Sequence, residues 1–381
     1  MTASVLCTKC VMDTTDPEIT FDGRGVCHHC KRYDLVIERL LSVGARGQER
    51  LGRLVEAIRR NGRGKEYDCV VGISGGVDST YALLKITQLG LRPLAIHLDN
   101  GWDPEPTVRN IQQALDRLGV ELVTHVLDWD EFRDLQLAFL KASTPDSEIP
   151  TDHAINAVLN AAARRFDLDF IVSGSNVRTE SHLPRLWSQG HSDWKYIRSV
   201  HERFGTVPLK TFPHLTFWEQ SWFAVRKGYI NILNYFEYVR RDAVLELQRG
   251  FGWQDYGAKH QESIYTRFYQ GVLLPKKFGF DKRRSHLSSM ICSGEITRAH
   301  ALTELEKPPY PADEQRKDYE YVAKKFGLRE EELAEIFACP PKRFQDYPSY
   351  DTPYYRLLGR SLRYASALYK HAAGTYDIFK N

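Results

Sequence analysis

The sequence of 381 residues contains no long apolar run, and its first residues do not place a basic segment before an apolar one. A membrane-spanning helix needs about 20 consecutive apolar residues, and a secretory signal needs the basic-then-apolar order. We therefore expect a cytoplasmic protein without a membrane partner. Charge of one sign is also scarce, because the formal net charge is only +3. This small excess gives no argument for a nucleic-acid partner.

Internal repeats and low-complexity tracts are also absent, which argues against solenoid and disordered classes. Apolar residues make up 42% of the chain and charged residues 27%, as in folded globular proteins. A chain of this length can form two or three domains. We expect a cysteine-rich segment (1–34), a helical linker (35–65), an α/β domain (66–255) and a basic, aromatic and helical C-terminal region (256–381).

Four of the seven cysteines lie within the first thirty residues, in two Cys-x2-Cys pairs. Each pair offers two thiolates from one tight turn, and four thiolates complete a tetrahedron around a zinc ion. Because four cysteines leave no open position, we expect one structural zinc ion. His28 and His29 lie between the last two cysteines and are alternative ligands. The predicted ligands are Cys7, Cys10, Cys27 and Cys30.

The central pattern is the stretch 67–80, which reads YDCVVGISGGVDST. Its apolar run, 69–73, is typical of a buried parallel strand, and residues 80–88 are compatible with a helix. Two glycines between them allow a tight turn and a close approach of backbone amides to an anion. The positive end of the helix would attract the same anion. The lysine of the common ATPase loop and the dinucleotide-binding glycine pattern are both missing here.

Further elements alternate along the α/β region. We predict strands near 94–98, 121–127 and 168–172, and helices at 107–118, 128–140 and 152–166. This alternation predicts a parallel sheet, and ligands of such sheets bind beyond the carboxyl ends of the strands. Polar residues follow two of these strands, His97-Leu98-Asp99-Asn100 and Ser173-Gly174-Ser175-Asn176. A polar turn or a helix cap is the alternative interpretation for each.

The stretch 253–291 interleaves Lys, Arg and His with Tyr and Phe. It permits three interpretations: a nucleic-acid surface, a site for an anionic substrate, or amphipathic helices with solvated charges. The aromatic residues of 181–255 indicate core, or a wall against which a sugar packs. Helices are predicted at 314–326, 329–337 and 356–372.

The SGGVDS loop resembles the PP-loop of the ATP pyrophosphatases, which include asparagine, GMP and NAD synthetases and tRNA-thiolating enzymes. Together with the cysteine pairs, GAKHQESIYTRFYQ and LPKKFGFDKRRSHLSSMICSG, it resembles the N-acetyl sugar amidotransferase family of bacterial surface-polysaccharide and flagellin-glycan pathways. The resemblance extends from Cys7 to about residue 305. One departure is SGSNVRTES, where a turn closer to Gly-Glu-Asn is expected.

The resemblance implies an adenine nucleotide alpha hydrolase-like sheet domain that splits ATP between its α- and β-phosphates. Asp78 is then a partner of Mg²⁺ or an organiser of the loop, and Glu180 and Asn176 contact substrate or magnesium unless they cap a helix. The implied nucleotide-binding residues are Ser74, Gly75, Gly76, Asp78, Ser79, His97, Asp99, Asn100, Gly174 and Asn176.

Family membership also implies a reaction. ATP adenylates the acetamido oxygen of a UDP-linked sugar, and ammonia replaces this oxygen to give an acetamidino sugar for O-antigen, LPS or flagellin glycan. The implied cofactors are ATP, Mg²⁺ and Zn²⁺. Positive side chains are wanted at the phosphates, and the candidates with Asp78 are Lys276, Lys277, Lys282 and Arg283. The candidate substrate-binding residues are His260, Glu262, Arg267, Arg283 and His286.

The sequence lacks a recognisable glutaminase, because Cys69, Cys292 and Cys339 do not lie in a nucleophile turn. The family implies a partner glutaminase and a barrel subunit, both resembling those of imidazole-glycerol-phosphate synthase, as the source of ammonia. Two alternatives stay open. One is a tRNA-thiolating PP-loop enzyme, and the other is an inactive scaffold that binds a glutaminase.

Overall fold

A five-stranded parallel sheet forms the centre of the computed structural model, which describes residues 4–255 and 262–372. The strand order is β3-β2-β1-β4-β5, and every neighbouring pair is parallel. The strands are β1 (Cys69–Gly72), β2 (Pro93–Asp99), β3 (Leu122–Val126), β4 (Phe170–Ser173) and β5 (Gly228–Asn231). The predicted α/β fold with a parallel sheet is therefore confirmed.

Both faces of the sheet are covered by helices, as a parallel sheet requires. Cys69 and Val71 of β1 pack into one core with side chains of α2 (Gly44–Asn61), α3 (Val77–Gln88), α4 (Glu105–Leu118) and α10 (Arg240–Phe251). Val70 faces the other way and joins a second core with Leu159 and Ala163 of α6 (Ile149–Arg165). The continuous apolar run of this strand follows from its burial on both faces.

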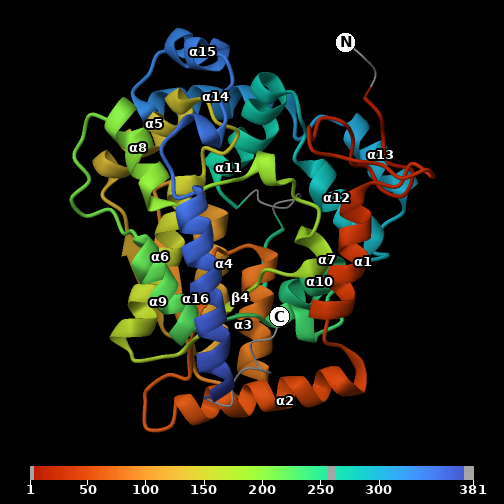
Figure 1. Cartoon of the computed structure of the whole chain (residues 1–381), viewed down its shortest axis with the longest axis vertical. Helices are drawn as coiled ribbons and strands as arrows, with labels where there is room; N and C mark the ends of the chain where they lie inside the picture. Colours follow the sequence, from red (N-terminus) through yellow and green to blue (C-terminus); the bar gives the residue numbers. More distant parts are fainter. Residues whose placement is uncertain (1–3, 256–261, 373–381) are drawn as a thin grey trace.

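The remaining helices build the ends and one side of the molecule. They are α1 (His28–Leu40), α5 (Trp129–Ala142), α7 (Val177–Glu180), α8 (Trp194–Phe204), α9 (Phe217–Arg226), α11 (Ile264–Phe268), a π-helical segment (Tyr269–Phe278), α12 (Arg283–Cys292), α13 (Arg298–Glu306), α14 (Ala312–Phe326), α15 (Glu330–Ala338) and α16 (Pro353–Ala372). The predicted helical C-terminal region is confirmed. Figure 1 shows α16 alongside α9 in front, with α14 and α15 at the top.

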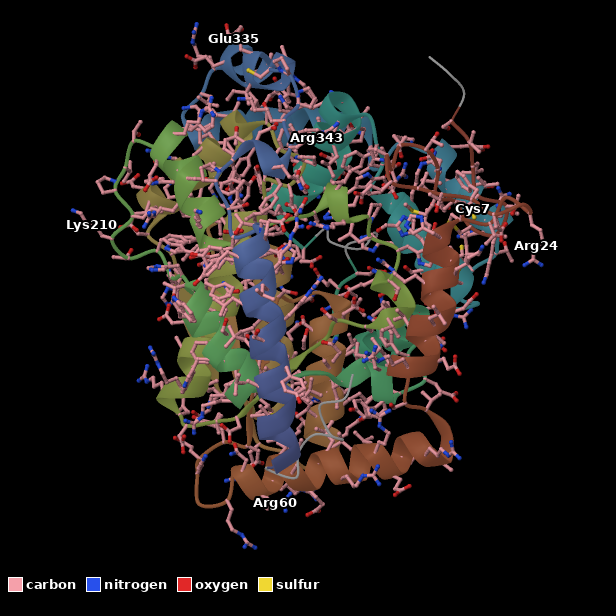
Figure 2. All side chains as sticks on the ribbon, viewed as in Figure 1. Cys7, Arg24, Arg60, Lys210, Glu335 and Arg343 are labelled. Atoms are coloured by element: carbon pink, nitrogen blue, oxygen red, sulfur yellow. The ribbon has the colours of Figure 1, made fainter. Side chains whose placement is uncertain are left out.

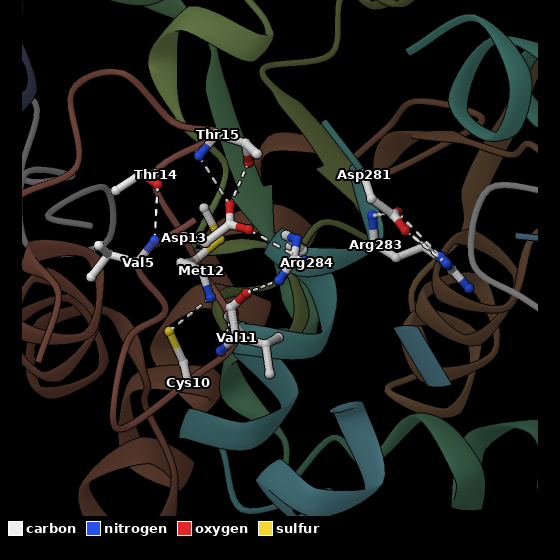
Figure 3. Close-up of polar contacts among 11 residues, drawn as sticks. Val5, Cys10, Val11, Met12, Asp13, Thr14, Thr15, Asp281, Arg283 and Arg284 are labelled. Carbon is white, nitrogen blue, oxygen red and sulfur yellow. Dashed lines mark hydrogen bonds and ion pairs between the residues drawn. The ribbon is translucent and has the colours of Figure 1, made fainter. Parts of the chain in front are cut away.

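The N-terminal loops lie beside the C-terminal helices, although they are far apart in sequence. In Figure 1 these loops, α12 and α13 occupy the same upper right part of the molecule. Arg298 donates hydrogen bonds to the carbonyl oxygens of Cys10 and Cys7, both at 3.0 Å. Arg284 donates to the carbonyl oxygen of Val11 and pairs with Asp13, whereas Arg283 turns toward Asp281 (Figure 3). The cysteine-rich segment is therefore held by α12 and α13.

Within the two described ranges, no helix combines the length and the hydropathy that a membrane crossing needs.

Candidate functional site

The candidate site lies where the order of the strands reverses. The chain runs from β1 to β2 on one side of β1, and later returns to place β4 on its other side. In open parallel sheets, ligands bind beyond the carboxyl ends of the strands at such a switch point. Two loops meet there, residues 74–76 after β1 and residues 174–176 after β4.

The loop after β1 has the conformation that its glycines allow. Gly75 has φ +76°, and a Cβ atom there would lie 2.9 Å from the carbonyl oxygen of Thr107. The hydroxyls of Ser74 and Ser79 lie 3.1 Å apart, and the Ser79 hydroxyl accepts the backbone N–H of Ser74 at 3.1 Å. The indole of Trp253 donates to the Gly75 carbonyl at 3.0 Å. The loop is thus fixed from both sides, with helix α3 starting directly behind it.

A cavity of about 420 Å³ opens in front of this loop, within the usual range of ligand pockets. Its lining joins the β1 and β4 loops to residues of several further segments, among them 96–103, 146–159 and 262–270. Among the predicted nucleotide-site residues, Ser74, Gly76, Asp78, Ser79, His97, Asn100 and Gly174 line it. The carboxylate of Asp78 accepts a hydrogen bond from the buried hydroxyl of Tyr238.

Gly174 is needed for contact between the two loops. A Cβ atom at this position would lie 2.5 Å from the carbonyl carbon and oxygen of Asp78 and 2.7 Å from the amide nitrogen of Ser79. The close backbone approach that the sequence indicated therefore occurs against the first turn of α3, while Gly174 also lines the cavity. The β4 loop positions the loop after β1.

Two predicted nucleotide-site residues have other contacts. Asp99 is not among the residues that line the cavity, and its Oδ1 accepts the backbone N–H of Gly101 at 2.8 Å. Asn176 caps α7, since its Oδ1 accepts the N–H of Thr179 at 3.0 Å. Both side chains stabilise turns, which was the alternative interpretation. Glu180 does line the cavity.

His97 lies between the loop after β1 and a carboxylate. Its Nδ1–H donates to the Ile73 carbonyl at 3.0 Å, and its Nε2 lies 3.0 Å from Oδ2 of Asp103. Burial lowers the pKa of His97, but the hydrogen bond and charge of Asp103 outweigh it and raise the pKa overall. The ion pair with Asp103 therefore favours the protonated form of His97 at this edge of the cavity.

Four cations were predicted to contact the phosphates, and one of these four, Lys282, lines the cavity. Lys276 is exposed, and Lys277 donates to the carbonyls of Ile336, Phe337 and Cys339. Arg267 makes two hydrogen bonds of 2.8 Å with Asp318. These two side chains therefore hold the C-terminal helices together.

Among the other predicted substrate-binding residues, some line the cavity and some lie outside it. Arg283 pairs with Asp281 and with two carbonyl oxygens, so its position outside the cavity has a structural explanation. His286 donates to the Thr179 carbonyl at 3.3 Å, also away from the cavity lining. Glu262 lines the cavity, with its carboxylate beside Gly76. His260 lies outside the described residues.

Several cavity residues had no sequence signal. Asp103, Asp146, Glu148 and Asp152 converge on the cavity from the segments after β2 and before and within α6. Burial, with help from Asp152, raises the pKa of Glu148 to about 8. The Thr266 hydroxyl donates to Glu148 at 2.8 Å. Acidic residues in a helix N-terminal turn are common, so only the fold could indicate that these carboxylates share one site.

The four predicted zinc ligands come together. Cys7, Cys10, Cys27 and Cys30 are fully buried, and all four sulfur atoms lie within 4.8 Å of one another. Sulfur–sulfur distances of 3.7 to 4.0 Å match the edge of a zinc–thiolate tetrahedron, which is about 3.8 Å for Zn–S bonds of about 2.3 Å. Figure 2 shows Cys7 among the N-terminal loops. The cluster suggests zinc.

The neighbouring histidines have other roles. His29 pairs with Asp16 at 2.7 Å, and His28 accepts the N–H of Thr20 at 3.2 Å. The four thiolates therefore fit the metal without either histidine.

A second cavity, of about 550 Å³, adjoins the first through Asp146, which lines both. Its wall includes the stacked rings of Trp187 and Phe280, whose centroids are 4.3 Å apart. Lys342 and Arg343 (Figure 2) add positive charge at its lining. The cysteine-rich segment contributes Glu18.

Comparison with known proteins finds one family model and several partial relatives. Residues 262–362 match the family model described as "LPS biosynthesis protein WbpG-like, C-terminal domain". The chain is 31% identical over 128 residues to the tRNA-specific 2-thiouridylase MnmA of Pseudoalteromonas translucida, covering 29% of this chain and 34% of that protein. It is 33% identical over 103 residues to the glutamine-hydrolyzing GMP synthase of Pyrobaculum aerophilum, covering 25% and 20%.

The chain thus spans about a third or less of the length of these curated relatives. Among solved structures, the NMN synthetase from Francisella tularensis matches with a TM-score of 0.35 and 13% identity, covering 74% of this chain and 97% of that one. The NH3-dependent NAD synthetase from Campylobacter jejuni matches with a TM-score of 0.30 and 12% identity, covering 67% and 96%.

Proposed function

We propose that this protein, which joins a WbpG-like C-terminal domain to a PP-loop domain, is an ATP-dependent amidotransferase of lipopolysaccharide or related glycan biosynthesis. The acetamido oxygen of a nucleotide-linked sugar attacks the α-phosphorus of ATP, and pyrophosphate leaves. Ammonia adds to the carbon of the adenylated imidate, and AMP leaves with the former amide oxygen. The products are an acetamidino sugar, AMP and pyrophosphate.

The observation that carries this proposal is that one cavity combines the two halves of the chain. The SGGVDS loop lines one side, and the WbpG-like domain contributes Glu262, Ser263, Thr266, Gln270 and Lys282. A PP-loop alone supports adenylation of many acceptors. The family description supplies the lipopolysaccharide context, and the shared lining supports an acceptor specific to that context.

The first step needs stabilisation of the leaving pyrophosphate. The loop amides, the Ser74 and Ser79 hydroxyls and the positive end of α3 provide this, because they are fixed before ATP arrives. Lys282 supplies a positive charge at the cavity. Carboxylates are suitable ligands for Mg²⁺, and Asp78 would hold it. When bound, Mg²⁺ supplies charge neutralisation at the phosphates.

The second step needs neutral ammonia beside the imidate. The carboxylates of Asp146 and Asp152 make the cavity attractive to ammonium. Glu148, with a pKa raised to about 8, is suited to accept a proton near neutral pH. We assign it the role of a general base that releases ammonia from ammonium or removes a proton after the attack.

The second cavity is the proposed place for the nucleotide part of the acceptor. Trp187 and Phe280 offer an aromatic wall, and Lys342 and Arg343 fit a diphosphate. Asp146 joins this cavity to the first, so the sugar would extend from one to the other. Lys342→Ala with Arg343→Ala should weaken binding of a UDP-linked acetamido sugar about tenfold or more, measured by titration calorimetry. Unchanged affinity would remove this cavity from the proposal.

The ammonia source is a further part of the proposal. Cys69 is buried in β1, and none of the seven cysteines lines the first cavity. We therefore propose a separate glutaminase, with a barrel subunit that conducts ammonia. The isolated chain should use ammonium but not glutamine, and adding both partners should confer glutamine use. Full glutamine-dependent activity of the isolated chain would contradict the need for a partner.

The MnmA relatives favour tRNA thiolation as a second candidate. Sulfur transfer through a protein thiol would need a cysteine at the adenylation cavity, and the cavity lining contains none. The two functions differ in their acceptor. Release of pyrophosphate from ATP in the presence of ammonium should depend on an acetamido sugar and not on tRNA. Release that depends on tRNA, with salt-sensitive tRNA binding, would replace the proposed function.

A further inference from the structure

A fifth cysteine and a histidine lie against the four-cysteine cluster. The Sγ atom of Cys292 lies 3.7 Å from that of Cys30 and 3.6 Å from Nε2 of His182. These three ligand atoms all lie within 4.8 Å of one another. They come from three separate elements: Cys30 from α1, His182 from the turn after α7, and Cys292 from the end of α12.

These distances fit a second tetrahedral metal ion. With Zn–S bonds of about 2.3 Å and Zn–N bonds of about 2.0–2.1 Å, two thiolates are separated by about 3.8 Å, and a thiolate and an imidazole by about 3.5–3.6 Å. Both observed distances agree with these expected separations to within about 0.1 Å. The donor set of two sulfurs and one imidazole nitrogen is also one that zinc prefers.

We propose that the protein binds a second zinc ion, held by Cys30, Cys292 and His182, with the Cys30 thiolate bridging the two metals. Water completes the fourth position, which is accessible because Cys292 is only partly buried. The inference does not depend on the proposed function.

Charge supports the bridged arrangement. Four thiolates around one Zn²⁺ carry a formal charge of −2, and all four sulfurs are fully buried. Because buried uncompensated charge is costly, a second Zn²⁺ with one added thiolate reduces the formal charge to −1. Hydrogen bonds from the backbone amides of Cys10 and Cys27 to the Cys7 sulfur stabilise the remaining charge.

The second ion would link the cysteine-rich segment to the cavity. His182 follows α7 by two residues, and the loop before α7 contributes Gly174 and Ser175 to the cavity lining while α7 itself contributes Glu180. The Ser289 hydroxyl, which accepts the backbone N–H groups of Ser181 and His182, already joins this turn to α12. A metal at the same junction would therefore fix the β4 loop against both α1 and α12.

The test is a count of metal ions in the intact protein. We expect native mass spectrometry of the full chain, purified after incubation with zinc and gel filtration, to show two zinc ions. Cys292→Ser keeps the size of a partly exposed side chain and should show one. The control Cys339→Ser changes an exposed cysteine outside both metal groups, and should keep two.

A second readout separates a lost ligand from a misfolded protein. After replacement of zinc by cobalt, two cobalt ions per chain should give tetrahedral absorption bands. Cys292→Ser should lose about a third of the thiolate-to-cobalt intensity, because the second site supplies two of the six cobalt–thiolate bonds, while its circular dichroism stays unchanged. One zinc ion in the unaltered protein, with the same count in Cys292→Ser, would overturn the inference. Cys292 would then be a thiol that donates a hydrogen bond to Cys30.

Discussion

At the scale of single residues, Gly174 decides how two loops meet. A methyl group at this position would be placed 2.5 Å from the backbone of Asp78, and backbone atoms cannot move aside as a side chain can. We predict that Gly174→Ala lowers the free energy of unfolding by about 1–3 kcal/mol and reduces pyrophosphate release at least about tenfold. Chemical denaturation and a pyrophosphate assay measure the two effects.

The matched control is Gly52→Ala in the middle of α2, where a Cβ atom would contact nothing within 4 Å. This substitution should raise stability by about 0.5–1 kcal/mol and leave the reaction rate unchanged. If Gly174→Ala behaves like Gly52→Ala, the close contact between the loops is not required.

Substitution of Asp78 tests whether the SGGVDS loop takes part in the reaction. Asp78→Asn keeps the size of the side chain and a hydrogen-bond acceptor for Tyr238, but removes the charge proposed to hold Mg²⁺. We predict a loss of pyrophosphate release of about 100-fold with little change in thermal stability. Tyr238→Phe keeps the charge and should cost less activity. Equal, small effects of both substitutions would place Asp78 outside the reaction.

The raised pKa of Glu148 should make the stability of the protein depend on pH. Its pKa rises from an ordinary value of 4.5 to about 8 in the folded protein, so between these values the folded state binds a proton that the unfolded state has lost. Stability from this group is complete below 4.5 and declines as the pH rises through about 8. We predict that Glu148→Gln becomes more stable than the unaltered protein over this range.

The expected gain for Glu148→Gln is about 2–4 kcal/mol at the alkaline end, because the partial exposure of the side chain to the cavity reduces the full effect. Denaturation curves from pH 5 to pH 9 measure it. The exposed Glu56→Gln is the control and should not change with pH. A constant difference between Glu148→Gln and the unaltered protein would show that the pKa is not raised.

The predictive power of the sequence also differs from residue to residue. Four cysteines in two pairs were sufficient to predict a metal cluster, because ligand spacing is a local property. The cations after residue 275 could not be assigned in the same way. Lys282 and Lys277 look alike in sequence, and only the packing of α15 against Lys277 separates them.

At the scale of elements, docking of the cysteine-rich segment on α12 and α13 is open to a direct test. Arg298 satisfies the carbonyls of Cys7 and Cys10. We predict that Arg298→Ala costs about 2 kcal/mol and speeds amide hydrogen exchange in residues 5–30. Arg316→Ala, which removes only exposed ion pairs of α14, is the control. Equal exchange rates in the two variants would show that this contact does not hold the segment.

Long amphipathic helices and apolar strands were predictable because their periodicity is local. Helix α3 begins at Val77, three residues before the predicted start at residue 80. The glycines before Val77 complete the turn within residues 74–76, so the helix includes the end of the SGGVDS stretch. Strand β5 was missed. It has four residues, and the Tyr229 side chain is 42% exposed, so neither an apolar run nor a clear alternation distinguishes it from the surrounding aromatic segment.

At the scale of the whole molecule, the site is made by segments that the sequence keeps apart. The SGGVDS loop, the acidic residues around α6 and the start of the WbpG-like domain meet at one cavity. The sequence identified the SGGVDS loop, the cysteine pairs before it and the basic, aromatic stretch 253–291 after it. It could not identify Asp103, Glu148 or the second cavity, because these depend on how the chain returns across the sheet.

The most direct test of the central claim is the mass of the product. The intact protein is incubated with ATP, Mg²⁺, ammonium and a panel of UDP-linked acetamido sugars, and each sugar is measured by mass spectrometry. We predict that one sugar becomes lighter by the difference between oxygen and NH, that ¹⁵N-labelled ammonium transfers its label to this product, and that AMP and pyrophosphate form in equal amounts. ATP cleavage to AMP with every sugar left unchanged in mass, or with the label absent from the sugar, would contradict amidine formation.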